Sequence, residues 1–176
     1  KNLVQNAPKM AGIILAMSKK ESFTRGAKGI VHCTYQLANM LKPHLQHDER
    51  FLFHNEADKN DVYQRYLSEK KQVILMACGM HEGIDLKYDL GRWQIIAKVI
   101  FPSLADPVNK ELLSTNPSLY NWKTVKTTIQ QYGRICRAED DYGITVILDS
   151  CFNMLYQRTK DSGMWPNWLK KSMEWI

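Results

Sequence analysis

Short apolar runs alternate with amphipathic stretches along most of this chain. Runs at 29–34, 50–55, 72–78, 93–101 and 144–150 have the length and composition of β-strands. The run QVILMAC at 72–78 is continuously apolar, as in a strand that is covered on both faces. Strands that alternate with helices favour a parallel sheet with right-handed crossovers. We therefore expect an α/β fold of three layers, with a mostly parallel central sheet and helices on both faces.

The amphipathic stretches between these runs predict helices. Residues 35–44 form one, disturbed near its end by a proline, and residues 60–71 form another, with an Asn-Asp start and a lysine-rich end. The chain would then be a single domain over 1–176, with a helical lead-in at 1–27 and a helical tail at 151–176. Four residues would dock this tail onto the body of the domain: Trp165, Trp168, Leu169 and Trp175.

A longer helix is predicted over 119–137. Its apolar residues recur every three or four positions and would share a core-facing side: Trp122, Val125, Ile129, Tyr132 and Cys136. Gln130, Arg134 and Arg137 fall at i, i+4 and i+7, on a second stripe roughly 140° from the first. Guanidinium groups match phosphate oxygens bidentately, and an arginine beside a phosphoryl group stabilises the charge that develops during its transfer. The stripe therefore indicates a clamp for a terminal phosphate; the alternative is a solvated charged face paired with the two aspartates that follow.

Composition narrows the class of protein only a little. The chain has 176 residues, of which 44% are apolar and 24% charged, as in an ordinary globular domain. Its net charge of +6 fits a polyanionic partner, although many proteins without such a partner share this charge. The longest early apolar run, MAGIILAM, is far too short to span a bilayer, so we expect no membrane partner.

The cysteines bear on metal binding and on the cellular compartment. Cys33, Cys78, Cys136 and Cys151 contain no C-x-x-C pair, so we expect no metal site on them. Cys33 and Cys78 lie inside apolar runs, where a free cysteine behaves as a small buried hydrophobe. This usage predicts a reducing, intracellular compartment, either the cytoplasm or, in a eukaryote, the nucleus.

The segment after the run at 72–78 is a second candidate site. In a parallel sheet, ligands bind beyond the carboxyl ends of the strands. Gly79 and Gly83 permit tight backbone conformations there, and Glu82 and Asp85 would lie at the mouth of the sheet. One alternative is a glycine-bearing turn with solvated acids. Another is the acid–base pair of a small-molecule enzyme, although no nucleophile or metal set accompanies these acids in the sequence.

A phosphate-binding loop is missing from the sequence. No G-x-x-x-x-G-K-[ST] motif occurs, and the only Asp-Glu pair, at 48–49, precedes a strand instead of ending one as a magnesium-binding pair would. The sequence therefore predicts half of a nucleotide site, with groups that sense phosphates but without the loop that holds them.

Several of these segments together resemble motifs of a known family. The family is the XPD/DinG family of superfamily 2 DNA helicases. EGID at 82–85 resembles its motif V. Motif VI is resembled by QQYGRICR at 130–137 followed by DYG at 141–143. KGIVHCTYQLANML at 28–41 resembles motif IV, and KVIFPSLADP at 98–107 resembles the proline-bearing segment between motifs V and VI. The resemblance implies a RecA-like fold. It covers the second lobe of the motor only, because the family's Walker motifs and iron–sulfur cysteines belong to the first lobe.

The resemblance also implies roles for individual residues. Arg137 would be the arginine finger, Arg134 would sense the γ-phosphate or lock motif VI to motif V, and Gln130 would also face the nucleotide. The other nucleotide-side positions would be Glu82, Gly83, Asp85 and Gly133. Of these, Asp85 would touch the ribose or pair with an arginine. The track for single-stranded DNA would be lined by Thr34, Tyr35, Gly79, Met80 and His81.

The protein implied by the resemblance is an ATP-dependent DNA helicase, with this chain as its C-terminal motor lobe. ATP and Mg²⁺ would be held mainly by a first RecA-like lobe of the same or a partner chain. An iron–sulfur cluster, where present, would also lie in that lobe. Single-stranded DNA would be the other partner, and the chain alone is expected not to hydrolyse ATP. The alternative is a non-enzymatic RecA-like module that binds nucleic acid or protein, with the motif VI arginines in a structural ion network.

Overall fold

The computed structural model describes residues 3–175, and this part of the chain divides into two compact units. One unit comprises the described residues up to Lys98 together with Gln130–Leu148. The other comprises Val99–Ile129 together with residues 149–175. The first unit contains the sheet and every candidate site residue named above. The prediction of one domain over the whole chain stays a prediction.

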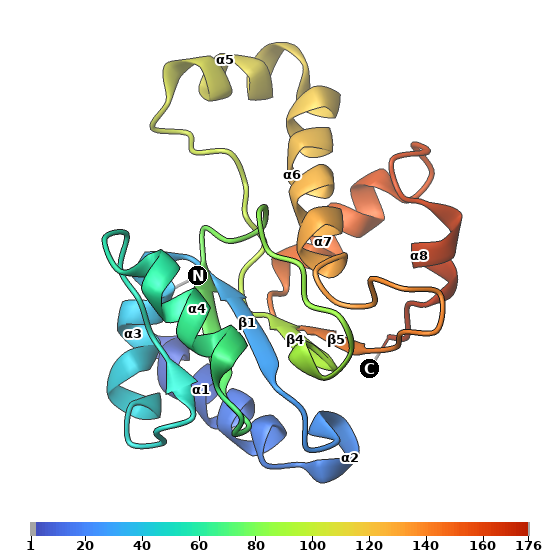
Figure 1. Cartoon of the computed structure of the whole chain (residues 1–176). Helices are drawn as coiled ribbons and strands as arrows, with labels where there is room; N and C mark the ends of the chain where they lie inside the picture. The colour runs from blue at the N-terminus through green and yellow to red at the C-terminus, as the bar shows by residue number, and fades with distance from the viewer. Residues whose placement is uncertain (1–2, 176) are drawn as a thin grey trace. The chain divides into compact units, whose positions relative to one another are not determined.

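A single parallel sheet forms the centre of the first unit (Figure 1). Within the described residues it has five strands in the order β2-β3-β1-β4-β5, and every neighbouring pair is parallel. The strands span Gly29–Cys33 (β1), Phe51–Leu52 (β2), Ile74–Cys78 (β3), Trp93–Ile96 (β4) and Ile144–Ile147 (β5). The predicted α/β fold is therefore confirmed, and the sheet is parallel throughout.

Helices cover both faces of this sheet. α1 (Leu3–Ser18) and α3 (Tyr35–Leu45) share one hydrophobic core with the sheet, and α4 (Lys59–Ser68) shares another on the opposite face (Figure 1). A short helix, α2 (Glu21–Thr24), lies between α1 and β1 in the chain. The three predicted layers are therefore present, and we call the two cores the α1/α3 core and the α4 core.

β1 shows how the sequence produces two cores. Its side chains alternate, so that Val31 and Cys33 join the α1/α3 core whereas Ile30 joins the α4 core. All five residues of β1 are buried, which explains its unbroken apolar character. The strand begins with Gly29 because a Cβ at this position would lie 2.0 Å from the ring of the buried Trp93.

Two strands are shorter than the apolar runs that predicted them. The run at 50–55 gives only the two residues of β2, because a turn follows in which the Asn55 N–H donates to Asp58 at 2.7 Å. The run at 93–101 stops as a strand at Ile96, since its neighbour β1 gives way to α3 and leaves it without a partner on that side. Apolar runs therefore mark where strands lie but overestimate their length.

The helix predicted over 119–137 ends earlier than its pattern indicated. α6 spans Pro117–Tyr132, and the chain then leaves the helix in a turn where Cys136 has a left-handed backbone, with φ of 59°. We call residues 133–137 the motif VI turn. It brings Ile135 into the α4 core, where this side chain is 2% exposed, and that burial favours ending the helix. The prediction that the amide and the two guanidiniums form a helical stripe is therefore wrong.

The buried face of α6 also differs from the prediction. Val125 is buried as expected, but Trp122 is 39% exposed and Cys136 is exposed, whereas Thr124 and Thr128 are buried. The two threonine hydroxyls donate to backbone carbonyls one turn earlier, at 3.4 and 2.9 Å. Threonines that are satisfied in this way can be buried, and a search for apolar residues alone misses them.

Helices make up the regular structure described in the second unit. α5 (Pro107–Thr115) was not predicted, although it has a clear start signal: Asp106 accepts the N–H of Val108 at 3.0 Å and Pro107 occupies the first turn. α7 (Cys151–Thr159) and α8 (Asn167–Lys171) follow in the tail.

The docking of the tail onto the body of the domain stays a prediction, because the packing described for its aromatic residues lies within residues 151–175. Trp165 and Leu169 are each 2% exposed, and the ring of Trp165 meets that of Phe152 in α7 edge-on, with centroids 5.7 Å apart. Trp168 and Trp175 are 55% and 54% exposed. Two of the four tail residues are therefore buried, and two lie largely at the surface.

Candidate functional site

The segment after β3, which carries motif V, is anchored by its apolar residues and exposes its acids. Met80, Ile84 and Leu86 are at most 3% exposed and lie in the α4 core. Asp85, between two of these anchors, has a side chain that is 51% exposed, and Glu82 is also exposed. Both acids therefore lie at the surface, in the segment that follows β3 in the chain.

Arg134 joins the motif VI turn to motif V. Its Nη1 donates to the Ile84 carbonyl at 2.8 Å and its Nε to the Gln130 carbonyl at 2.7 Å, while the Leu86 N–H donates to the Arg134 carbonyl at 3.2 Å. Burial and the nearby Arg137 lower the pKa of the Arg134 guanidinium. Of the two roles considered for Arg134, the contact with motif V is the one seen in the structure.

Two further pairs join the same segments at the surface. Arg137 Nε donates to Asp85 Oδ1 at 2.7 Å, and Gln130 Nε2 donates to Glu82 Oε1 at 2.8 Å. The Arg137 side chain is 39% exposed, and its Nη1 donates to the Gly133 carbonyl at 3.0 Å. The predicted nucleotide-side residues are thus brought together, with one guanidinium that reaches solvent.

Asp141, the acid of the DYG segment, fixes this arrangement, a role that the sequence did not indicate. Its side chain is 0% exposed and accepts four hydrogen bonds: from Arg92 Nη1 at 2.6 Å and from the backbone N–H groups of Tyr88 (3.1 Å), Arg137 (3.1 Å) and Tyr142 (2.9 Å). Burial alone would raise the pKa of the Asp141 carboxyl, but these N–H groups and the Arg92 guanidinium outweigh it and lower the pKa. The buried carboxylate therefore holds the backbone of Arg137 in place.

The glycine of the DYG segment is explained by close packing. A Cβ on Gly143 would lie 2.6 Å from Ile135 Cδ1 and 3.1 Å from the Arg92 carbonyl oxygen. On the other side, a Cβ on Gly91 would lie 2.7 Å from Ile135 Cγ2. Ile135 is therefore held between two glycines, and a larger residue at either position would displace the motif VI turn.

The predicted DNA contacts lie at the carboxyl ends of β1 and β3. Thr34 caps α3, because its hydroxyl accepts the Leu37 N–H at 3.2 Å. The half-buried ring of Tyr35 meets that of His54 edge-on, with centroids 5.5 Å apart. Met80 is 3% exposed, so its side chain belongs to the core and only its backbone is able to face DNA.

A buried polar network connects β1, β4 and β5 with the end of α6. His32 is fully buried, and its Nε2 lies 3.0 Å from Gln94 Oε1, while the Gln94 amide donates to the Tyr132 carbonyl and the Thr145 hydroxyl, each at 2.8 Å. The Gln94 oxygen is an acceptor, so His32 Nε2 carries the proton. Burial lowers the pKa of His32 to about 4. A neutral histidine thus orients the amide that holds the end of α6; among the described residues, the Nδ1 atoms of His32 and His81 have no hydrogen-bond partner.

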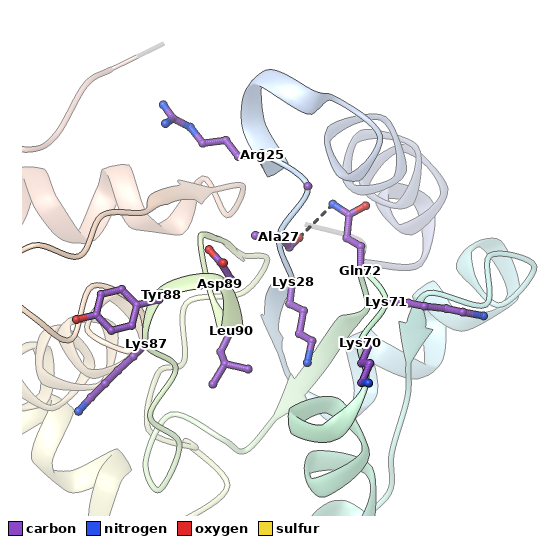
Figure 2. A pocket seen from close by; sticks show the side chains of 11 residues that line it. Arg25, Ala27, Lys28, Lys70, Lys71, Gln72, Lys87, Tyr88, Asp89 and Leu90 are labelled. Carbon is purple, nitrogen blue, oxygen red and sulfur yellow. Dashed lines mark hydrogen bonds between the residues drawn. The ribbon is translucent and has the colours of Figure 1, made fainter.

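A basic cavity of about 530 Å³ opens at the opposite edge of the sheet, before the starts of β1, β3 and β4. Figure 2 shows that the ends of Lys28 and Lys70 lie toward the same space, whereas Arg25, Lys71 and Lys87 point away from it. The Lys28 ammonium already donates to two carbonyls in the last turn of α4, at 2.7 and 3.1 Å. The charges do not converge on one point, so we assign no ligand to this cavity.

No helix within residues 3–175 is long and apolar enough to cross a membrane. Nor do three His, Cys, Asp or Glu side chains in this range gather as metal ligands would.

The sheet and the linkage of motifs V and VI define the class of protein, a RecA-like lobe. The structure titled "Structure of S. tokodaii Xpd4" matches 89% of this chain and 32% of that chain, with a TM-score of 0.61 and 16% sequence identity. At this identity the likeness shows the fold alone.

The family follows from the sequence match. The family described as "Helicase C-terminal domain" matches residues 31–172, and the chain belongs to it. The chain is also similar to the regulator of telomere elongation helicase 1 homologs of Drosophila persimilis and Drosophila melanogaster, at 30% and 28% identity over 107 residues, or 52% of this chain. It covers only 11% of the length of either relative. The resemblance to the XPD/DinG helicases is confirmed, and the chain is a helicase C-terminal domain of that type.

Proposed function

We propose that this lobe completes the ATP site of a DNA helicase and contacts single-stranded DNA as the helicase moves. The observation that supports this proposal is the exposed cluster in which Arg137 and Gln130 of motif VI meet Asp85 and Glu82 of motif V. The chain has no phosphate-binding loop, so the nucleotide would be held by a first lobe that faces this cluster. Closure of the two lobes around ATP would bring the cluster to the phosphates.

Arg137 is the residue that we assign as the arginine finger. Its backbone is fixed by Asp141, while its guanidinium is partly exposed and pairs with Asp85 at 2.7 Å. A positioned guanidinium of this kind would stabilise the charge on the transferred phosphoryl group. Arg134 directs its donors at backbone carbonyls, so we assign it a positioning role.

The assignment is tested by Arg137→Ala in a protein that joins this chain to a Walker-bearing first lobe. We expect kcat for ATP hydrolysis to fall by about 10³-fold or more, since a lost arginine finger has an effect of this size. The free energy of unfolding should change by less than about 1 kcal/mol, because the ion pair is exposed.

A matched control is Lys87→Ala, which removes an ammonium 3.9 Å from the same Asp85 carboxylate. Hydrolysis should stay within about twofold of the unchanged protein, because such a weak exposed pair contributes little. If Arg137→Ala hydrolysed ATP at a similar rate, Arg137 would not be the finger.

For DNA, we assign phosphate contacts to the Thr34 hydroxyl and to the backbone at Gly79, Met80 and His81, and a stacking role to the Tyr35 ring. Fluorescence anisotropy with a labelled oligonucleotide should show an affinity that falls steeply with salt. Tyr35→Ala should weaken binding by about 1–3 kcal/mol, whereas Tyr35→Phe, which keeps the ring, should bind almost normally. Affinity that is independent of salt, or equal for the two variants, would contradict this track.

A second candidate function is favoured by the same ion pair and hydrogen bond. Arg137 and Gln130 already have partners within this chain, as expected of a structural network in a non-enzymatic module that binds nucleic acid or protein. The open reading frame that encodes the chain discriminates between the two functions. A Walker-bearing lobe in that frame or in a partner chain supports the helicase, and the absence of such a lobe supports the binding module.

A further inference from the structure

Two cysteines face each other at the ends of β1, which belongs to motif IV, and β3, which precedes motif V. Cys33 ends β1 and Cys78 ends β3, and the two residues are directly opposite each other in the parallel register. Their sulfur atoms are 3.5 Å apart, and the residues are 0% and 1% exposed. Neither is oxidised in this structure. The sequence predicted only two small core residues here, but the register makes them a pair.

The geometry of this pair is close to that of a disulfide. Neighbouring parallel strands are about 4.8 Å apart, within the roughly 4.4–6.8 Å that separates the Cα atoms of bonded cysteines. The sulfurs would close from 3.5 Å to about 2.05 Å, which side-chain rotation is able to provide. We propose that Cys33 and Cys78 are a redox-active pair that forms a reversible disulfide with hydrogen peroxide and so links the ends of β1 and β3.

The surroundings make Cys78 the more reactive thiol. The hydrogen bond from Cys33 lowers the pKa of Cys78; burial opposes this effect, and the Lys59 ammonium adds to it. The same hydrogen bond and burial raise the pKa of Cys33. Lys59 is held at this edge of the sheet because its Nζ donates to the Gly79 carbonyl at 3.0 Å. A lowered pKa raises the thiolate fraction of a cysteine, and the thiolate is the form that attacks an oxidant.

The residue that follows Cys78 is open to solvent. This residue is Gly79, and a Cβ built on it would meet nothing within 4 Å. Hydrogen peroxide, which is small and neutral, is therefore the oxidant that we name.

Hydrogen peroxide would oxidise the two thiols to a disulfide in two steps. The Cys78 thiolate attacks one peroxide oxygen, the O–O bond breaks, and hydroxide leaves and takes up a proton to become water. Cys78 is then a sulfenic acid. The Cys33 sulfur attacks the Cys78 sulfur, the S–O bond breaks, and the leaving hydroxide takes the Cys33 proton. Two electrons pass from the thiols to the peroxide, which becomes two waters.

The resulting bond should be easily reduced. Side chains of adjacent parallel strands are directed alongside each other, so the bond would depart from relaxed disulfide geometry, and strained disulfides are the labile ones. The pair is thus suited to reversible oxidation and not to permanent bracing. This chemical assignment does not depend on the helicase function proposed above.

The test uses the 176-residue chain itself. The reduced chain is exposed to hydrogen peroxide, then unfolded and alkylated, and its mass is measured. We expect two thiols to be protected from alkylation, with a mass loss of about 2 Da for the bond. Tryptic peptides 29–50 and 72–87 should be joined, and dithiothreitol should separate them.

Cysteine variants show which two cysteines form the disulfide. A Cys136→Ser/Cys151→Ser chain keeps only the proposed pair and should still form the bond. Cys33→Ser should instead accumulate a sulfenic acid on Cys78 that dimedone traps. The proposal is overturned if Cys33 and Cys78 remain fully alkylated under peroxide that oxidises the exposed Cys136, or if the only linkages involve Cys136 or Cys151.

Discussion

Replacing Asp141 should destabilise the motif VI turn more than replacing the acid beside it. The Asp141 carboxylate is 0% exposed, accepts four hydrogen bonds and pairs with Arg92, whose side chain is 11% exposed. Asp140 is exposed and accepts a hydrogen bond from the Tyr88 hydroxyl at 3.1 Å. The two neighbouring acids therefore form a matched pair, one buried and one at the surface.

The magnitude follows from the charge that would be left behind. Removing one partner of a buried ion pair costs about 3–5 kcal/mol, because the other charge stays buried and unpaired. Arg92 keeps a contact with Asp89 at 3.0 Å, so Asp141→Ala should lie near the lower end of this range. Asp141→Asn keeps one acceptor oxygen and should cost about 1–2 kcal/mol. Asp140→Ala should cost less than about 0.5 kcal/mol.

Urea unfolding of the chain at a series of pH values measures these costs. The folded-state pKa of Asp141 is lowered below its unfolded value, so its contribution is present above that value. The contribution is lost as the pH falls below about 4, and Asp141→Asn should show a smaller loss over the same range. If Asp141→Ala and Asp140→Ala cost the same at pH 7, the role given to Asp141 would be wrong.

Two further predictions concern the supports of the motif VI turn. Arg134→Ala removes the donors to the Ile84 and Gln130 carbonyls and should lower the free energy of unfolding by about 2–4 kcal/mol in a urea titration. Arg134→Lys should recover part of this loss. A cost below about 0.5 kcal/mol for Arg134→Ala would contradict the linkage between the motif VI turn and motif V. The pKa of His32 is about 4 in the folded chain and about 6.5 when unfolded, so stability should fall by about 2 kcal/mol from pH 7 to pH 5, and His32→Gln should flatten this step. A step of the same size in the variant would show that another group titrates.

Local patterns were enough to predict the sheet and to pick out the segments that meet in the candidate site. The continuous run at 72–78 becomes β3, with all five of its residues buried. EGID and QQYGRICR each carry a recognisable order of residues, and the structure brings Asp85 to Arg137 and Glu82 to Gln130. Short segments of this kind can be recognised in a sequence because their residue types and spacing are set within a few positions.

The remaining features depend on partners that are distant in the sequence. α6 stops at Tyr132 and the turn buries Ile135 between Gly91 and Gly143, which helical periodicity cannot reveal. Asp141 meets Arg92 and Tyr88 from 49 and 53 positions away. The pairing of Cys33 with Cys78 likewise requires the strand register. These contacts become visible only when the sheet order is known.

ATP hydrolysis by the purified chain, alone and joined to a Walker-bearing first lobe, tests whether this chain supplies one half of an ATP site. The chain alone should not hydrolyse ATP, with or without single-stranded DNA, because it lacks a phosphate-binding loop. The joined protein should hydrolyse ATP in response to DNA and lose this activity with Arg137→Ala. Steady hydrolysis by the isolated chain that disappears with Arg137→Ala would contradict the account, because the whole site would then lie within these residues.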